Sequence, residues 1–307
     1  MRHNEIILYH YPASPYAEKV RLMAGCLGVP WHSVEVPIQP PRETLSLLAG
    51  GYRRIPVAQV GADIYCDTAL ISEQITARTT SPLATDSEAV VALADHAEQQ
   101  AFFAAIRQNS QLKTAMGLIL KLGVKGMMAF AKDRATFAVG YAPAMLTPAE
   151  AKAVFKQYLE DLAANLLSAR FLGGDTPCLG DFRCYHPIFL AIAFQSVKEA
   201  HLPEAVRAWL KRVEAFGWGQ VSVMTDLDAL EVARSETPDP MSEAAAAHAD
   251  VGEWVTVSPT DTGKVPVTGT LVGMDAERIS LLRRSDDVGD VHVHFPTAGF
   301  ECIKINQ

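Results

Sequence analysis

The pattern of apolar and polar positions divides the chain into three regions of different character. Over the first 80 residues, short apolar runs alternate with segments of helical periodicity. From Ser87 to Leu230 nearly all apolar positions repeat with helical spacing, whereas after residue 250 short β-branched runs are separated by turn residues. The stretch from Ser235 to Ala249 is rich in Pro, acidic residues and Ala, and we interpret it as a linker. The fold class predicted is α/β, then all-α, then small all-β.

The N-terminal region is predicted to follow the order β-α-β-α-β-β-α, an α/β layer domain. Its first helix has clear boundaries, because Ser14 is a good N-cap, Pro15 suits the first helical position and Gly28 ends the periodic run. The expected strands are 6–9, 31–36, 57–60 and 63–66, and the expected helices are 15–27, 41–49 and 68–77.

Two helices of the middle region are marked by local signals. Thr147-Pro148-Ala149-Glu150 forms a capping box with Pro at the first helical position. A second helix begins at Asp181, and its part from Tyr185 to Phe194 is apolar nearly all round, which predicts the centre of a helical bundle. Pro187 lies within that part and should kink the helix or displace its start.

The last 58 residues, 250–307, contain five or six short strand patterns. This number of strands in so short a segment predicts a small β-barrel, SH3-like by strand count. A barrel of this size is marginal alone, so we expect it to dock on the rest of the chain through strands such as Val291–Phe295. We place it outside the chemistry, so that truncation at Ala249 should lower stability or solubility but leave ligand binding within a few-fold.

Composition narrows the class of protein. A length of 307 residues predicts two or three domains, and 49% hydrophobic with 20% charged residues excludes global disorder. The 27 Lys and Arg against 35 Asp and Glu give a charge of −8, which argues against a nucleic-acid partner. Apolar runs are too short for a membrane span, and the first residues do not form a signal peptide. Five cysteines without an export signal favour a reducing, cytoplasmic location.

Three short segments carry candidate chemistry. Ser14 is an ordinary N-cap in one interpretation, and in the other its hydroxyl and the helix N-terminus stabilise a bound thiolate. In one interpretation Pro56 is an ordinary residue before the start of a strand. In the other it follows a cis peptide bond and lets the backbone of Val57 pair with an extended peptide. Asp67 and Thr68 either cap a helix or hold the ammonium and carboxylate of a ligand. No His or Asp lies at a spacing typical of a hydrolase triad with Ser14.

The order and spacing of these segments resemble one family. Ser14-Pro15-Tyr16 is followed by Lys19-Val20-Arg21, then by Arg54-Ile55-Pro56-Val57 and by Cys66-Asp67-Thr68-Ala69-Leu70-Ile71. This pattern is similar to the N-terminal domain of cytosolic glutathione transferases, particularly serine-type classes such as tau. With Asp181 at the position of the family's helix-capping Asp, the resemblance covers about three quarters of the chain. It implies a thioredoxin-like glutathione-binding domain at 1–80 and an all-helical domain with a hydrophobic substrate pocket at 87–235, followed by a linker at 236–249 and the barrel at 250–307.

The resemblance also implies residue roles. Ser14 would hydrogen-bond the glutathione sulfur, and the backbone of Val57 would pair with the cysteinyl moiety behind a cis Pro56. Asp67 and Thr68 would hold the γ-glutamyl end, and Arg54 would lie near the glycyl carboxylate. The Asp-Thr pair departs from the usual Glu-Ser, and Cys178 replaces the usual Ser or Thr of the capping box. Tyr9 and Tyr11 are alternatives to Ser14 as the thiolate partner.

The apolar segment Met116–Phe130 has three interpretations. It packs in the core, it forms an adaptable wall of the electrophile pocket, or it lies on a membrane surface flanked by lysines. For the second interpretation the pocket residues are Tyr16, Met116, Met127 and Phe130.

His292 and His294 lie on one face of a strand. A metal site would need a third ligand, and none has a recognisable spacing, so we predict no metal and a solvent-facing strand.

Two functions remain open. The first is a transferase that uses glutathione as co-substrate and an apolar small-molecule electrophile, or that catalyses a related glutathione-dependent step, with a homodimer as one assembly. The second is a non-catalytic module that binds a ligand or a protein.

Overall fold

A computed structural model describes residues 5–108, 111–137, 141 and 145–305, with side chains from residue 123 onward in the long helix that begins at Gln111. The chain forms two compact units. The first unit consists of Met1–Ala17, Gly28–Arg78 and Gln220–Gln307, and the second of Glu18–Leu27 and Thr79–Gly219.

The order expected for the N-terminal region is confirmed. Its elements are β1 (Ile6–His10), α1 (Pro15–Leu27), β2 (Trp31–Glu35), α2 (Glu43–Ala49), β3 (Val57–Val60), β4 (Asp63–Cys66) and α3 (Thr68–Thr76). Strand β1 pairs in parallel with β2 and antiparallel with β3, and β3 pairs antiparallel with β4. This mixed sheet is the thioredoxin-like part of the fold.

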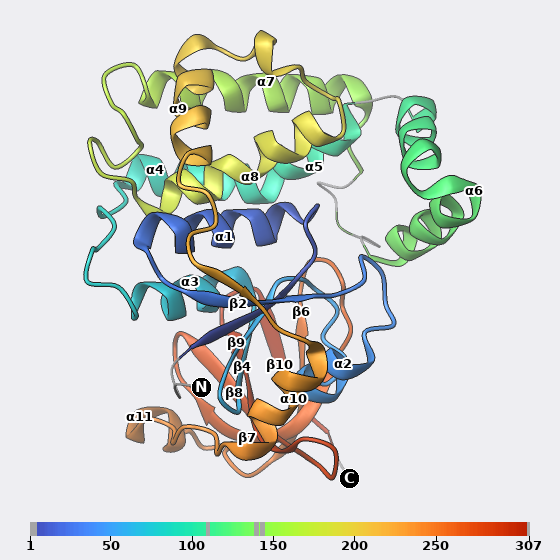
Figure 1. Cartoon of the computed structure of the whole chain (residues 1–307), viewed down its shortest axis with the longest axis vertical. Coiled ribbons are helices and arrows are strands. Elements are labelled where there is room, and N and C mark those ends of the chain that lie inside the picture. The colour runs from blue at the N-terminus through green and yellow to red at the C-terminus, as the bar shows by residue number, and fades with distance from the viewer. Residues whose placement is uncertain (1–4, 109–110, 138–140, 142–144, 306–307) are drawn as a thin grey trace. The chain divides into compact units, whose positions relative to one another are not determined.

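The sheet extends at both edges with strands from the C-terminal third of the chain. At one edge, β5 (Val221–Val223) runs parallel to β2. At the other edge, β9 (Gly289–Pro296) runs parallel to β4, so the expected contact through Val291–Phe295 is confirmed. Figure 1 shows the orange-red strand β9 beside the light-blue strand β4. The remaining strands are β6 (Trp254–Pro259), β7 (Val267–Met274), β8 (Arg278–Ser285) and β10 (Phe300–Lys304).

The expected SH3-like barrel is not confirmed, because the sheet is not closed. The strand order of the sheet is β10-β6-β7-β8-β9-β4-β3-β1-β2-β5, with β10 and β5 at its two edges. In a self-contained barrel β9 would bond only to barrel strands, whereas here its second edge bonds to β4. Buried side chains of the C-terminal strands also share one core with Ile55 and Ile64. The strand-rich segment is therefore part of the first unit, which differs from the separate barrel expected at 250–307.

The segment interpreted as a linker contains a short helix that contacts the sheet, and the helix just before this segment packs on the first unit as well. Helix α10 (Asp226–Ser235) contacts α2, where the Thr44 hydroxyl donates to an Asp226 carboxylate oxygen at 2.7 Å. Helix α11 (Glu243–Ala246) contacts β7. A Cβ atom on Gly273 of β7 would lie 3.0 Å from the side chain of Met241, so glycine allows this close approach.

The second unit is helical, as expected. It contains α4 (Glu88–His96), a π-helical turn (Ala97–Ala101), α5 (Phe102–Arg107), α6 (Gln111–Phe137), α7 (Pro148–Asn165), α8 (Leu179–Ala193), a 3₁₀ turn (Glu199–His201) and α9 (Glu204–Glu214). Among the described helices, none is both long and apolar enough to span a membrane.

Helix α8 is buried on nearly all sides and accommodates Pro187 without ending. It begins at Leu179, two residues before the expected start, because Asp181 caps it from within. The Asp181 carboxylate accepts the Cys178 N–H at 2.8 Å and the Trp209 indole N–H at 2.6 Å. Burial raises the pKa of Asp181, against the lowering effect of these hydrogen bonds.

Candidate functional site

Ser14 lies at the N-terminus of α1, where the sequence places it. Its Oγ accepts the Ala17 N–H at 3.2 Å, and its own N–H donates to the Tyr11 carbonyl at 3.0 Å. The hydroxyl oxygen acts as an acceptor in this cap, so its hydrogen can still be donated. The residue is only 1% exposed, so a ligand sulfur has to approach a nearly buried hydroxyl.

The two tyrosines considered as alternatives to Ser14 differ in environment. The Tyr9 hydroxyl donates to Gln59 Oε1 at 2.6 Å, and Gln59 in turn donates to the Ala229 carbonyl at 2.9 Å. Burial raises the pKa of Tyr9. Tyr9 is thus a hydrogen-bonded residue of the core. Tyr11 is half-buried and remains an alternative to Ser14 as the partner of the thiolate.

Asp67 has an unusual backbone conformation at the N-terminus of α3. Its φ of 79° and ψ of 145° lie in a region that residues other than glycine rarely adopt. One carboxylate oxygen accepts the Ala69 N–H at 3.0 Å and caps the helix, and the other lies 3.9 Å from an Arg54 nitrogen. Thr68, the first residue of the helix, is largely buried. The structure therefore brings Arg54 together with the Asp67-Thr68 pair.

Arg54 also contacts two residues that the sequence analysis did not single out. Its guanidinium pairs with the Asp261 carboxylate and donates from Nε to the Thr262 carbonyl at 3.1 Å. Both residues belong to the segment between β6 and β7. More than 200 residues separate them from Arg54, so no spacing signal could have found them. A C-terminal segment thus contacts a residue predicted to bind the ligand.

Pro56 and Val57 lie where the chain enters β3. The Ile55–Pro56 peptide bond is cis, and Val57 is the first residue of the strand. Val57 stands opposite Tyr9 of β1 and Cys66 of β4.

The four residues assigned to a hydrophobic pocket lie in both units. Tyr16 is half-buried near the start of α1, in the first unit. Met127 and Phe130 are half-buried in α6 of the second unit, and the Arg134 guanidinium lies 5.3 Å from the Phe130 ring centre. Met116 falls outside the residues whose side chains are described. In the same helix Val124 and Met128 are exposed, so core packing does not account for the whole described segment.

His292 and His294 do not face solvent, so that expectation is wrong. His294 is 1% exposed and the side chain of His292 is 13% exposed. Both face β4, because β9 runs beside that strand and not at a free edge.

Comparisons with known proteins agree with this geometry. A family model for the glutathione S-transferase N-terminal domain matches residues 8–83. The structure of a GST-like protein from Pseudomonas syringae is 30% identical, covers 98% of this chain and 100% of its own, and superposes with a TM-score of 0.74. Because the match covers nearly the whole chain, it includes the C-terminal strands.

Other solved structures are more distant. FzlA from C. crescentus is 20% identical over 69% of this chain and 88% of its own, with a TM-score of 0.49. A possible glutathione S-transferase from Rhodopseudomonas palustris is 18% identical over 80% and 97%, with a TM-score of 0.46. The comparison with curated proteins finds no match. The N-terminal family match and the end-to-end likeness to the Pseudomonas syringae structure together establish that this chain belongs to the family of glutathione S-transferase-like proteins.

Proposed function

We propose that this protein binds glutathione in its N-terminal region and stabilises the glutathione thiolate for attack on an apolar electrophile. Family membership supports glutathione chemistry in general. The residues proposed to act are Ser14 on the sulfur, Val57 on the cysteinyl backbone, Asp67 and Thr68 on the γ-glutamyl end, and Arg54 near the glycyl carboxylate.

The observation that carries this proposal is the conformation of Asp67. A non-glycine residue with φ of 79° costs on the order of 1–3 kcal/mol and persists only where the surroundings hold it. This conformation lets one carboxylate cap α3 and lie 3.9 Å from Arg54. A ligand with both an ammonium and a carboxylate, such as the γ-glutamyl group, would find complementary charges here.

The proposed chemistry needs only a stabilised thiolate. The Ser14 hydroxyl would donate to the sulfur, and the N-terminus of α1 would favour its negative charge. The thiol proton would leave to solvent, and a sulfur lone pair would form the bond to the electrophilic carbon while the leaving group departs with its electron pair. The five cysteines are free thiols, which supports a reducing compartment such as the cytoplasm.

The Asp67→Asn variant tests the proposal. Asparagine keeps a helix cap and tolerates positive φ, so the fold should be retained while the charge is removed. Loss of one charged hydrogen bond corresponds to roughly 1.5–3 kcal/mol, so calorimetry should give a glutathione Kd higher by a factor of about 10 or more. Wild-type affinity in this variant would exclude Asp67 from the site.

A non-catalytic module is the second candidate, and two observations favour it. Ser14 is nearly buried, and Arg54 is already paired with Asp261 of the same chain. If millimolar glutathione leaves the unfolding temperature of the wild-type protein unchanged, the binding-module function is preferred.

A further inference from the structure

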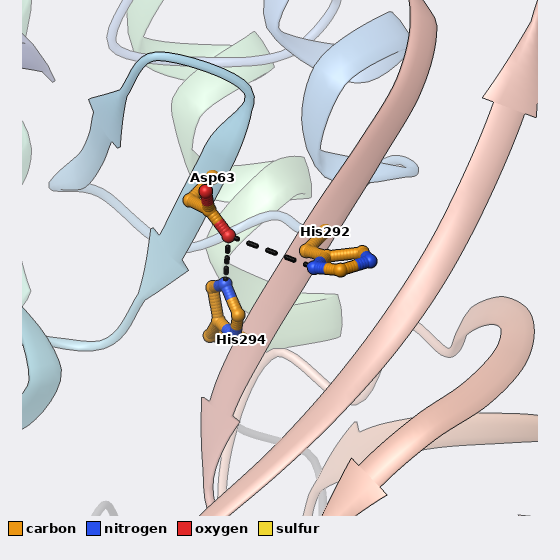
Figure 2. Close-up of side chains that lie close together, drawn as sticks. All are labelled: Asp63, His292 and His294. Atoms are coloured by element: carbon orange, nitrogen blue, oxygen red, sulfur yellow. Dashed lines mark hydrogen bonds and ion pairs between the residues drawn. The ribbon is translucent and has the colours of Figure 1, made fainter. Parts of the chain in front are cut away.

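A cluster of three metal-ligating side chains joins β4 to β9. Asp63 is the first residue of β4, and the parallel register places it opposite His292. His294 lies two residues further along β9, on the same face. One atom from each of Asp63, His292 and His294 lies within 4.8 Å of the other two. Figure 2 shows a single Asp63 carboxylate oxygen facing both imidazoles.

The two distances from Asp63 to the imidazoles are close to the ligand spacing of a zinc site. Asp63 Oδ1 lies 2.7 Å from His294 Nε2 and 3.7 Å from His292 Nδ1. Ligand atoms about 2.0–2.1 Å from a tetrahedral Zn²⁺ ion are about 3.3 Å apart. Movements of less than about 1 Å would therefore bring these two pairs to tetrahedral spacing.

His292 supplies a second, independent observation. Its Nδ1 is buried, and within the part of the chain that the structure describes it has no hydrogen-bond partner. A buried polar atom without a partner costs roughly 1–3 kcal/mol, so such atoms are rare and call for an explanation. A cation between His292, His294 and Asp63 would satisfy this nitrogen.

The groups around the cluster have the orientation expected of a second coordination shell. The Nδ1 of His294 lies 2.8 Å from the Ser280 hydroxyl, so it can donate there while Nε2 binds a metal. The second Asp63 oxygen accepts the Asp239 N–H at 2.9 Å, which orients the carboxylate.

We propose that Asp63, His292 and His294 bind one divalent zinc ion that links the N-terminal sheet to the C-terminal strands. Two imidazoles and one carboxylate form a donor set that suits Zn²⁺, with water as the fourth ligand. Asp63 lies 229 residues before His292 in the chain, so no spacing motif in the sequence indicates it as the third ligand. The site is independent of the proposed glutathione chemistry.

The test measures zinc content and its effect on stability in the full-length protein. The protein is stripped with a chelator and dialysed against Zn²⁺, and bound zinc is measured by mass spectrometry. We expect one zinc per chain and an unfolding temperature raised by zinc. Cobalt substitution should give the absorption of a tetrahedral nitrogen and oxygen site without thiolate charge-transfer bands, which separates this site from the five cysteines.

His292→Gln is the decisive variant, because the Nδ1 it removes has no hydrogen bond to lose. It should fold like the wild type by circular dichroism and lose both the zinc and the zinc-dependent rise in unfolding temperature. Asp63→Asn should do the same, and His201→Gln, at an exposed position of the 3₁₀ turn, should leave both unchanged. Failure of the wild type to retain zinc, or full zinc content in His292→Gln, would overturn the proposal and leave Asp63–His294–Ser280 as a structural hydrogen-bond network.

Discussion

At the scale of single residues, Ser14 combines two roles at one atom. As N-cap it satisfies the Ala17 N–H of α1, and as the proposed sulfur ligand it would donate the hydrogen that the cap leaves unused. The sequence could predict this residue because Ser-Pro before an apolar run is a local signal. It could not predict that Tyr9 is engaged with Gln59, 50 residues away, which argues against Tyr9 as the alternative.

A half-buried acidic residue of the helical unit, Glu98, makes the stability depend on pH. Burial would raise the pKa of Glu98, but Lys19 at 2.5 Å and Arg183 at 2.8 Å outweigh it and hold the pKa at about 2. An acid with a depressed pKa stabilises the fold above its unfolded pKa, and this contribution is lost as the pH falls toward 2. His186 adds to the loss, because burial lowers its pKa to about 3 and its protonation opposes folding.

We expect the free energy of unfolding of the wild type to fall between about pH 6.5, where His186 begins to contribute, and pH 2. Glu98→Gln should lower stability near pH 7 by about 3 kcal/mol and flatten the decline, since 1 pKa unit corresponds to about 1.36 kcal/mol. Denaturant unfolding at several pH values measures both effects. Parallel pH profiles in the two proteins would show that Glu98 is not the titrating group.

At the scale of elements, the segment between β6 and β7 contacts the predicted glutathione site. The carboxylate of Asp261 binds the same guanidinium that would bind a glutathione carboxylate. Two carboxylates that need one guanidinium compete for it. We therefore infer that this segment lowers the affinity for glutathione.

Asp261→Ala should tighten glutathione binding several-fold, since it frees Arg54 without removing it. Calorimetry on the full-length variant measures the change. Glu301→Ala of β10 is the control, because it also removes a carboxylate, one that accepts from the Ser258 hydroxyl of β6 and not from Arg54. Weaker binding in Asp261→Ala would mean instead that Asp261 holds Arg54 in its binding position.

The sequence predicted local elements better than their pairing. The Ser14-Pro15 cap, the Thr147–Glu150 capping box and the seven N-terminal elements depend on residues near one another in the chain, and they agree with the structure. The pairing of β9 with β4 depends on residues more than 200 positions apart, and apolar alternation in β9 fits a separate barrel and a shared sheet equally well. The same long separation in sequence explains why Asp261 could not be predicted as a partner of Arg54, nor Asp63 as a partner of His294.

At the scale of the whole molecule, the first unit depends on both ends of the chain. The ring of Tyr52 lies 5.8 Å from that of Phe295, and Ile55 and Ile64 share their core with the C-terminal strands. Removal of residues 250–307 would uncover this core and free the edge of β4. The expectation that truncation leaves the ligand site almost unchanged therefore needs revision.

We expect a chain that ends at Ala249 to lose cooperative unfolding of the first unit and to expose apolar surface. Circular dichroism melting and binding of a hydrophobic dye, both compared with the full chain, measure this effect. A truncated protein that melts as sharply as the full chain and binds glutathione equally well would show that the C-terminal strands are a separate domain.

The central claim is that the protein stabilises glutathione as a thiolate, and the pKa of the bound thiol tests it most directly. Ultraviolet absorption of the thiolate is followed against pH in the saturated glutathione complex. The account predicts a bound thiol pKa at least about 1 unit below the usual value of about 8.5, and a return toward that value in Ser14→Ala. A bound thiol that titrates like free glutathione, or a wild-type pKa retained in Ser14→Ala, would contradict the account.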